Sequence, residues 1–362
     1  MIQKAVVQFS QSEDCDFVHL PFFFTPDVST ARKGGLDKAR ELFRVFSRLL
    51  KIHNTGPIDL CLYPVGGPQR VPLIRDLLLL PWVILFSRRV VLHFHAAGIA
   101  DRLDKGPDKI LAQLVALVYR RAYAAIVMTN FNRRDPDAIG MKRVTVVPHR
   151  IVDEFDPSLL RRGESATTRL LYVGHLCPDK GTPELLQAFA ALQKKLPGLE
   201  VDLIGECLPP FRQSDLEELL DKLQIKSKVR VRGVVTGRAK SEAFAGADLF
   251  VFPTVAPYES FGLVLVEAMS WGLPIVASNW RGNADVLTPR AGAIRFPTSP
   301  SLAENLTSAL ASALEQRGSW PQWGEINRQI FEERYRENSD DRWLANAVLQ
   351  FLPPGAGNGE AR

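Results

Sequence analysis

Residues 247–272 constrain the fold more than any other part of the chain. The run 247–252, Ala-Asp-Leu-Phe-Val-Phe, predicts a buried strand that ends at Pro253. After a loop, Ser260 is expected to cap a helix that runs to about Trp271. A strand followed by a loop and a helix is typical of one unit of a parallel α/β sheet.

Two carboxylates flank the start of this predicted helix. Glu259 lies just outside the first turn and Glu267 about two turns in. The backbone N–H groups of Phe261, Gly262 and Leu263 have no intrahelical partner, and a glycine lets an anion approach the main chain closely. The pattern predicts a phosphate site, with a polyol held by the two acids.

Glu267 has two interpretations. It is either a solvent-facing helix residue or a buried carboxylate that binds a ligand. The helix is apolar nearly all round from Leu263 to Trp271, which indicates burial on several faces. A buried carboxylate needs hydrogen-bond donors, and either sugar hydroxyls or a structural arginine would supply them. The ligand interpretation is favoured.

The residues around these acids resemble a known family. Glu259-x7-Glu267, within Glu-Ser-Phe-Gly-Leu-Val-Leu-Val-Glu-Ala-Met and followed by Gly-Leu-Pro-Ile-Val-Ala at 272–277, resembles the signature of the family 4 retaining glycosyltransferases. The stretch 170–181 resembles the strand, loop and helix that open the donor domain of that family. The strands expected near 201–205 and 229–233 are also similar. The resemblance implies a GT-B fold, in which two Rossmann-like domains face each other across a cleft.

The resemblance also implies roles for individual residues. Glu259 would hold sugar hydroxyls, Glu267 the ribose hydroxyls and Lys180 the diphosphate, while the backbone around Arg230 would border the base. The residues expected to bind the donor are Gly174, His175, Lys180, Arg230, Val231, Glu259, Ser260, Phe261, Gly262, Leu263 and Glu267. The residues expected to act in catalysis are His95, Lys180 and Glu259.

Lys180 and His175 follow the predicted strand 170–173, at the sheet edge where ligands bind in open α/β folds. A cation there can offset charge that develops on a departing diphosphate. A surface lysine beside a helix start is the alternative, although the positive helix dipole disfavours it. His175 stands where the resembled family usually has arginine, and an imidazole is a weaker phosphate ligand than a guanidinium group.

His93 and His95 lie two residues apart on the predicted strand 90–95, so they share one face. His95 is at the end of the strand, where members of the resembled family often place a histidine near the transferred sugar. Two packed histidines are the alternative, which we prefer for His93. The pair suggests no metal site, because no third ligand of suitable spacing is evident. No metal or other cofactor is expected, since Lys180 and helix N-termini would supply the positive charge.

Composition fits a soluble protein of two domains. The chain has 362 residues, of which 46% are hydrophobic and 23% charged. Its four cysteines show no paired spacing, which favours a reducing cytoplasm, and its first residues lack the apolar core of a secretory signal. The net charge of +5 comes with no nucleic-acid motif. The longest apolar run, 77–86, is too short to span a bilayer.

Strands and helices alternate along the chain, which predicts parallel sheets. The expected regions are an acceptor-side domain (1–153), a linker (154–169), a donor-binding domain (170–314), helices that cross back to the first domain (315–352) and a disordered tail (353–362). In the first domain the strand expected at 16–20 follows a helix. The opening strand and glycine-rich loop of the resembled fold are therefore expected to be absent, leaving a gap in the sheet. A start codon placed too late, a fragment or a degraded copy would each explain this.

These observations predict a metal-independent, hexosyltransferase-like enzyme. It would move a sugar from a nucleoside diphosphate sugar to a glycan, a lipid-linked acceptor or a small molecule. The alternative is a nucleotide-sugar-binding homologue with little or no turnover. Peripheral contact with the inner face of a membrane is a further hypothesis. The helix 36–51 places Leu36, Ala39, Phe43, Phe46 and Leu50 on one face and Arg40, Arg44, Arg48 and Lys51 beside it. A core helix with a solvated basic side is the alternative.

Overall fold

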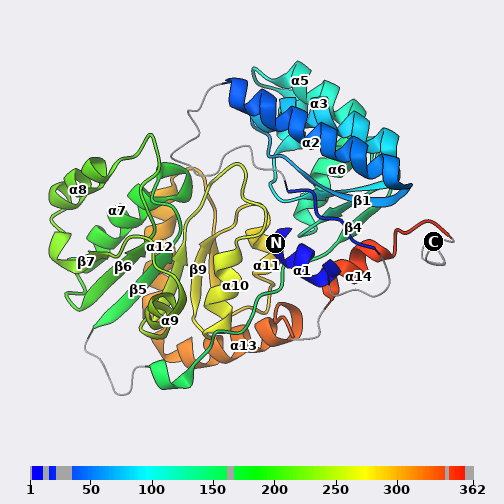
Figure 1. Cartoon of the computed structure of the whole chain (residues 1–362). Coiled ribbons are helices and arrows are strands. Elements are labelled where there is room, and N and C mark those ends of the chain that lie inside the picture. Colours follow the sequence, from blue (N-terminus) through cyan, green and yellow to red (C-terminus); the bar gives the residue numbers. More distant parts are fainter. Residues whose placement is uncertain (1, 11–15, 22–34, 161–166, 339–341, 355–362) are drawn as a thin grey trace. The chain divides into compact units, whose positions relative to one another are not determined.

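The computed structural model describes residues 2–10, 16–21, 35–160, 167–338 and 342–354 (Figure 1). The chain divides into two compact units, which we call unit 1 (residues 1–147 and 340–362) and unit 2 (residues 148–339). The division after Val147 precedes the expected linker, so the described part of that segment lies in unit 2. Of the tail expected at 353–362, residues 355–362 lie outside the described residues.

Unit 1 contains a four-stranded parallel sheet in the order β1-β2-β3-β4. Its elements are α1 (Ile2–Ser10), α2 (Gly35–Thr55), β1 (Ile58–Val65), α3 (Arg70–Phe86), β2 (Ser87–Phe94), α4 (Ile99–Asp104), α5 (Lys109–Tyr119), β3 (Ala124–Val127), η2 (Phe131–Arg133), α6 (Arg134–Ile139), β4 (Val144–Val146) and α14 (Trp343–Leu349). Because successive strands are neighbours and parallel crossovers are right-handed, the crossover helices cover the same face.

The two faces of this sheet have separate apolar cores. On one face, Tyr63, Leu92 and Val127 pack with residues of α2, α3 and α5. On the other face, side chains including Val91 and Ile126 pack with residues of α1 and α14. The sheet is therefore covered on both sides by helices of unit 1, as a parallel sheet requires.

Two expectations for unit 1 were wrong. Residues 16–20 form no regular strand, and no strand precedes β1 among the described residues. The expected gap in the sheet is not seen, because all four strands pair with their neighbours. In α2 the core is contacted by Val45 and Leu49, whereas Phe43 and Leu50 of the predicted apolar face are 71% and 39% exposed. The side chains of Leu36 and Ala39 lie outside the described part of the chain.

Unit 2 contains a six-stranded parallel sheet in the order β10-β9-β8-β5-β6-β7. Its elements are η3 (Pro157–Leu159), β5 (Thr168–Val173), η4 (Pro178–Lys180), α7 (Thr182–Gln193), β6 (Leu199–Ile204), α8 (Gln213–Lys222), η5 (Lys226–Lys228), β7 (Val229–Val231), α9 (Gly237–Ala245), β8 (Leu249–Phe252), α10 (Leu263–Ser270), β9 (Ile275–Ser278), α11 (Asn283–Val286), β10 (Ala293–Phe296), α12 (Leu302–Glu315), η6 (Arg317–Ser319) and α13 (Trp320–Arg334). The chain first builds β5, β6 and β7 outward, then returns to place β8 on the other side of β5. This is the strand order of a doubly wound Rossmann-like fold, with its switch point between β5 and β8.

Both faces of the unit 2 sheet are covered. Leu170, Val201 and Leu249 pack with residues of α7, α8 and α12 on one face. On the opposite face, Phe244 of α9 stacks on Phe250 of β8, with ring centroids 5.9 Å apart.

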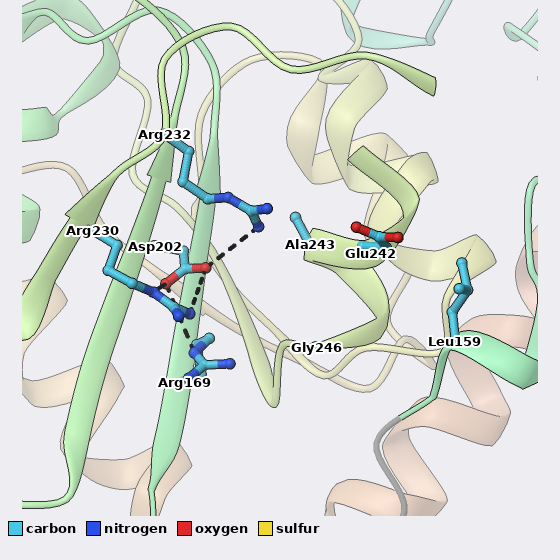
Figure 2. A pocket seen from close by; sticks show the side chains of 8 residues that line it. All are labelled: Leu159, Arg169, Asp202, Arg230, Arg232, Glu242, Ala243 and Gly246. Carbon is cyan, nitrogen blue, oxygen red and sulfur yellow. Dashed lines mark hydrogen bonds and ion pairs between the residues drawn. The ribbon is translucent and has the colours of Figure 1, made fainter. Parts of the chain in front are cut away.

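An ion cluster also lies in unit 2 and lines a pocket of about 370 Å³ (Figure 2). Its centre is Asp202 on β6, whose side chain is 2% exposed. Arg230 binds both carboxylate oxygens at 2.7 and 2.9 Å, and Arg169 and Arg232 lie 3.7 Å away. Three cations therefore compensate the buried carboxylate, which would otherwise be costly to bury.

Candidate functional site

The switch point of unit 2 brings together two loops that are far apart in sequence. Strands β5 and β8 pair in parallel, with Leu170 opposite Leu249 and Leu171 opposite Phe250. The loops that leave their carboxyl ends therefore emerge side by side. In open α/β sheets, ligands bind in the crevice at this point.

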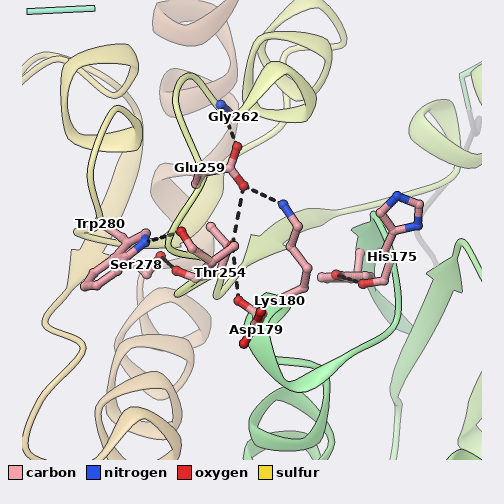
Figure 3. A network of polar contacts seen from close by, with 10 residues as sticks. His175, Asp179, Lys180, Thr254, Glu259, Gly262, Ser278 and Trp280 are labelled. Carbon is pink, nitrogen blue, oxygen red and sulfur yellow. Dashed lines mark hydrogen bonds and ion pairs between the residues drawn. The ribbon is translucent and has the colours of Figure 1, made fainter. Parts of the chain in front are cut away.

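Lys180 and Glu259 meet across these two loops (Figure 3). Lys180 Nζ donates to Glu259 Oε2 at 2.6 Å, and the two side chains are only 13% and 12% exposed. The Val255 N–H donates to the Asp179 carbonyl at 2.8 Å and so ties the two loops together. The Thr254 hydroxyl lies 3.4 Å from Glu259 Oε2. A cation and a carboxylate are thus held at the sheet edge by main-chain contacts.

Gly262 fixes the turn between Glu259 and α10. Its φ is 66°, and a Cβ there would lie 2.5 Å from Asn283 Oδ1, so only glycine fits without a shift. The Gly262 N–H donates to Glu259 Oε1 at 3.2 Å. Gly262 is the N-cap of α10, so the expectation that Ser260 caps the helix was wrong. The carboxylate of Glu259 binds the N–H that a hydroxyl cap would have bound.

Glu267 lies inside α10, with its side chain 18% exposed. Its Oε1 accepts a hydrogen bond from Lys240 Nζ of α9 at 2.6 Å. Its Oε2 is buried and has no hydrogen-bond partner among the described residues. Burial raises the pKa of Glu267, and the charge of Lys240 opposes that shift. A buried acceptor without a donor is costly, so this atom marks a place where a ligand hydroxyl would be stabilised.

Two more residues predicted to bind the sugar donor, Gly174 and His175, lie on the loop after β5. Tyr172 donates its hydroxyl to the His175 carbonyl at 2.7 Å, and the His175 side chain is exposed. No contact is drawn to the imidazole in Figure 3. A Cβ at Gly205 would lie 1.9 Å from the Gly174 carbonyl oxygen, so the loop after β6 packs closely on this one.

The other residues predicted to bind the sugar donor lie in different surroundings. The Arg230 side chain binds Asp202, and Val231, at the end of β7, is 37% exposed. Phe261 and Ser260 are buried, with the Phe261 ring 5.9 Å from that of Tyr335. Leu263 is 39% exposed. These side chains are not part of the Lys180–Glu259 contact.

His95 belongs to unit 1, directly after β2. The rings of His93 and His95 lie 4.1 Å apart, and His93 is 2% exposed. Burial lowers the pKa of His95 to about 4. The His95 imidazole is therefore neutral at pH 7, when it can accept a proton or a hydrogen bond through one ring nitrogen.

Sequence reasoning missed Lys240, the cation that contacts Glu267. No motif marks it, because α9 and α10 are separate helices and only their packing brings the two residues together.

The chain also contains two Asp-x-Asp sequences, at 14–16 and 135–137. Asp135 accepts the N–H groups of Gly98 and Ala100 at 2.9 and 2.8 Å and so holds the loop after β2. Most of the other, residues 14–16, lies outside the described part of the chain.

Comparison with known proteins shows which proteins this chain resembles. Residues 162–330 match the family model of the glycosyl transferases group 1. The chain is 31% identical over 170 residues to the uncharacterized glycosyltransferase YqgM of Bacillus subtilis, covering 47% of this chain and 45% of that protein. It is 27% identical over 214 residues to the glycogen synthase of Mycobacterium tuberculosis, covering 58% and 48%. The chain thus spans less than half the length of these curated relatives.

Solved structures match over more of the chain. Sucrose-phosphate synthase from Thermosynechococcus elongatus aligns with a TM-score of 0.68 at 17% identity, covering 88% of this chain and 79% of that one. HepE of Anabaena, solved with UDP and glucose, aligns with a TM-score of 0.66 at 20% identity, covering 88% and 83%. The fold is that of the GT-B glycosyltransferases, with two α/β units built on parallel sheets. This confirms the predicted fold class.

Proposed function

We propose that this chain is a retaining glycosyltransferase of family 4 type that takes a sugar from a nucleoside diphosphate sugar. The observation that carries the proposal is the Lys180–Glu259 contact at the switch point of unit 2. It places a cation and a carboxylate where the fold binds ligands. The similarity of residues 162–330 to glycosyl transferases group 1 supports it.

In this proposal Lys180 binds the diphosphate and offsets the negative charge that grows on it as the glycosidic bond breaks. Lys180 would exchange its contact with Glu259 for one with the phosphate oxygens. Glu259 would then accept hydrogen bonds from sugar hydroxyls and hold the ring in position. Because Glu259 already accepts the Gly262 N–H, a positioning role fits it better than that of a nucleophile.

Glu267 would bind the ribose through the Oε2 atom that lacks a donor. Lys240 holds the other carboxylate oxygen and favours the ionised form, which is the better acceptor. The base would lie along the backbone near Arg230 and Val231. HepE was solved with UDP, which makes uridine the first nucleotide to test and guanosine the second.

The finer parts of the proposal concern the sugar, the acceptor and the setting. The sugar is a hexose, and the acceptor is a glycan, a lipid-linked carrier or a small molecule. Catalysis would need no metal, since Lys180 supplies the positive charge at the diphosphate. The protein would act in the cytoplasm, with peripheral contact at the inner face of the membrane.

Calorimetric titration with UDP and GDP tests the donor site. Glu267→Ala should weaken binding of the preferred nucleotide by about 1.5–3 kcal/mol, the usual worth of hydrogen bonds to a charged group. Glu217→Ala, on the exposed surface of α8, is the matched control and should leave affinity unchanged. Equal affinities for wild type and Glu267→Ala, with both proteins folded, would refute the ribose assignment.

A nucleotide-sugar-binding homologue without turnover is the second candidate. The exposed His175, which stands where the resembled family has arginine, favours it. Incubation with radiolabelled UDP-glucose and UDP-N-acetylglucosamine separates the two candidates. Transfer or slow hydrolysis of the donor that disappears in Lys180→Ala supports the enzyme. Tight donor binding without either reaction supports the homologue.

A further inference from the structure

Helix α3 of unit 1 exposes a continuous apolar stripe. Every three or four residues along the helix, an apolar side chain faces solvent. These are Val71, Ile74, Leu78, Trp82 and Leu85, which are 50%, 40%, 50%, 44% and 67% exposed. The opposite side of the same helix, which includes Leu73 and Leu80, is buried against the sheet. The stripe is thus an outer face, and the core does not use it.

Two of the three charged residues of α3, Arg75 and Asp76, turn inward. Asp76 is fully buried and accepts hydrogen bonds from the Tyr63 hydroxyl at 2.8 Å and the Gly66 N–H at 2.9 Å. Arg75 binds the same carboxylate and is 18% exposed. A helix on a water-facing surface normally has the reverse arrangement, with charge outside and apolar residues inside.

The neighbouring helices extend the stripe into a broader patch. Helix α3 contacts both α2 and α5, and the three lie side by side on unit 1 (Figure 1). Helix α5 adds Ile110, Leu114 and Leu117, which are 74%, 46% and 52% exposed, and α2 adds Phe43. We call these exposed residues of the three helices the α2–α3–α5 face. Exposed apolar side chains gathered on three neighbouring helices indicate an interaction site.

Basic side chains border the α2–α3–α5 face. Arg44, Arg48 and Lys51 are exposed along α2, and Arg70 and Lys109 are exposed at the first residues of α3 and α5. Two nearby acids are already paired, Glu41 with Arg44 at 2.6 Å and Asp108 with Arg70 at 3.7 Å. The border is therefore net positive.

We infer that the α2–α3–α5 face docks on an anionic lipid bilayer. Apolar side chains would enter the boundary between headgroups and acyl chains, and the basic border would contact lipid phosphates. A second copy of the chain fits less well, because two basic borders would repel each other. The inference concerns unit 1 alone and stands independently of the donor site in unit 2.

Vesicle co-sedimentation of the full chain tests the inference. We expect binding to vesicles of phosphatidylcholine with 30% phosphatidylglycerol, which fades as salt rises from roughly 0.1 to 1 M because screening shortens the range of charge. The triple variant Leu78→Gln, Leu85→Gln, Ile110→Gln should partition on the order of 100-fold less, since it loses three apolar side chains. Glutamine keeps the helices intact, because its helix propensity is close to that of leucine.

Matched controls separate this face from exposed apolar residues elsewhere. Val152→Gln with Leu196→Gln removes two exposed apolar residues of unit 2 and should leave vesicle binding unchanged. Trp82 gives a direct reading, because acyl chains brominated near the headgroup should quench its fluorescence. Trp82→Phe should lose that quenching and still bind vesicles.

Three outcomes would overturn the inference. The first is sedimentation with anionic vesicles no greater than with neutral vesicles. The second is equal vesicle binding by wild type and the triple variant. The third is that wild type forms a dimer that the triple variant abolishes, while neither protein binds vesicles. Nucleotide titration of the triple variant keeps the two proposals distinct, since its affinity should match wild type. Vesicle binding that follows the expected pattern while neither protein binds UDP or GDP would uphold the docking face and refute the proposed donor site.

Discussion

At the scale of single residues, Lys180 is the side chain on which the proposed donor site depends most. Its Nζ lies 2.6 Å from Glu259 and also 5.6 Å from the centre of the Tyr258 ring. Carboxylate and ring together hold the ammonium group at the switch point. His175 has no comparable support, because its side chain is exposed.

This difference predicts unequal effects on nucleotide binding. Lys180→Ala should weaken affinity for the preferred nucleoside diphosphate about 10- to 100-fold, because a charged hydrogen bond is lost. His175→Ala should cost less, and His175→Arg should tighten binding because a guanidinium forks onto phosphate. Calorimetry measures all three, with Lys195→Ala as an exposed control. Weaker binding by His175→Arg would mean that the imidazole has a specific role.

His95 predicts a pH dependence of stability. Its pKa is about 4 in the folded chain, below the usual 6.5, because it is buried. Between these two pH values His95 binds more protons in the unfolded chain than in the folded chain. The free energy of unfolding is therefore not reduced by His95 above pH 6.5, and it falls as pH decreases towards 4. The loss amounts to about 3 kcal/mol. Urea unfolding of wild type should therefore weaken more steeply over this window than unfolding of His95→Gln. Equal slopes would contradict the assignment.

Sequence reasoning could relate the candidate site residues that belong to one contiguous motif. Glu259, Gly262 and Glu267 lie within nine positions of one another, so their relation could be predicted from a strand, a loop and a helix. Lys240 could not be predicted, because its contact with Glu267 depends on how α9 packs beside α10. The Arg230 side chain faces Asp202 for a similar reason, namely the pairing of β6 with β7.

At the scale of elements, long and strongly patterned segments were predictable and short polar ones were not. The apolar run 77–86 falls within helix α3, which spans Arg70–Phe86 and has Pro81 inside it. Residues 16–20 were expected to form a strand but form none, because a strand also needs a neighbour to pair with. In α2 two apolar stripes compete, and the one through Val45 and Leu49 faces the core.

The N-terminus of α10 offers a test of how an element positions a side chain. Gly262→Ala should destabilise the protein by about 1–3 kcal/mol, because the backbone has φ 66° and the added Cβ would meet Asn283. The strain should also displace Glu259, whose carboxylate accepts the Gly262 N–H. Nucleotide affinity should therefore fall as well.

Gly318→Ala is the matched control for this change. Gly318 has open space around its Cβ position, so stability should be unaffected there. A Gly262→Ala protein with wild-type unfolding temperature and nucleotide affinity would contradict the role given to this turn. Thermal unfolding and calorimetry on the same samples provide both measurements.

At the scale of the whole molecule, alternating strands and helices predicted two parallel α/β units, and the structure has them. The position of the division was harder to predict. Asp153, expected at the end of the first domain just before the linker, forms an ion pair with Arg328 of α13 and so belongs to unit 2. The polarity of a segment shows only that it can be exposed to solvent. Which unit a charged residue joins depends on the residue it pairs with, here Arg328.

The two units also make a prediction about thermal unfolding. Each has its own apolar core, so calorimetry should resolve two transitions. All residues proposed to contact the nucleotide lie in unit 2, and a ligand stabilises only what it binds, by about 2.7 kcal/mol at 100 times its Kd. The preferred nucleotide should therefore raise one transition by roughly 5–10 °C and leave the other unchanged. Lys180→Ala should abolish the shift at the same nucleotide concentration. A nucleotide that moves both transitions equally, or a shift that persists in Lys180→Ala, would refute a donor site confined to unit 2.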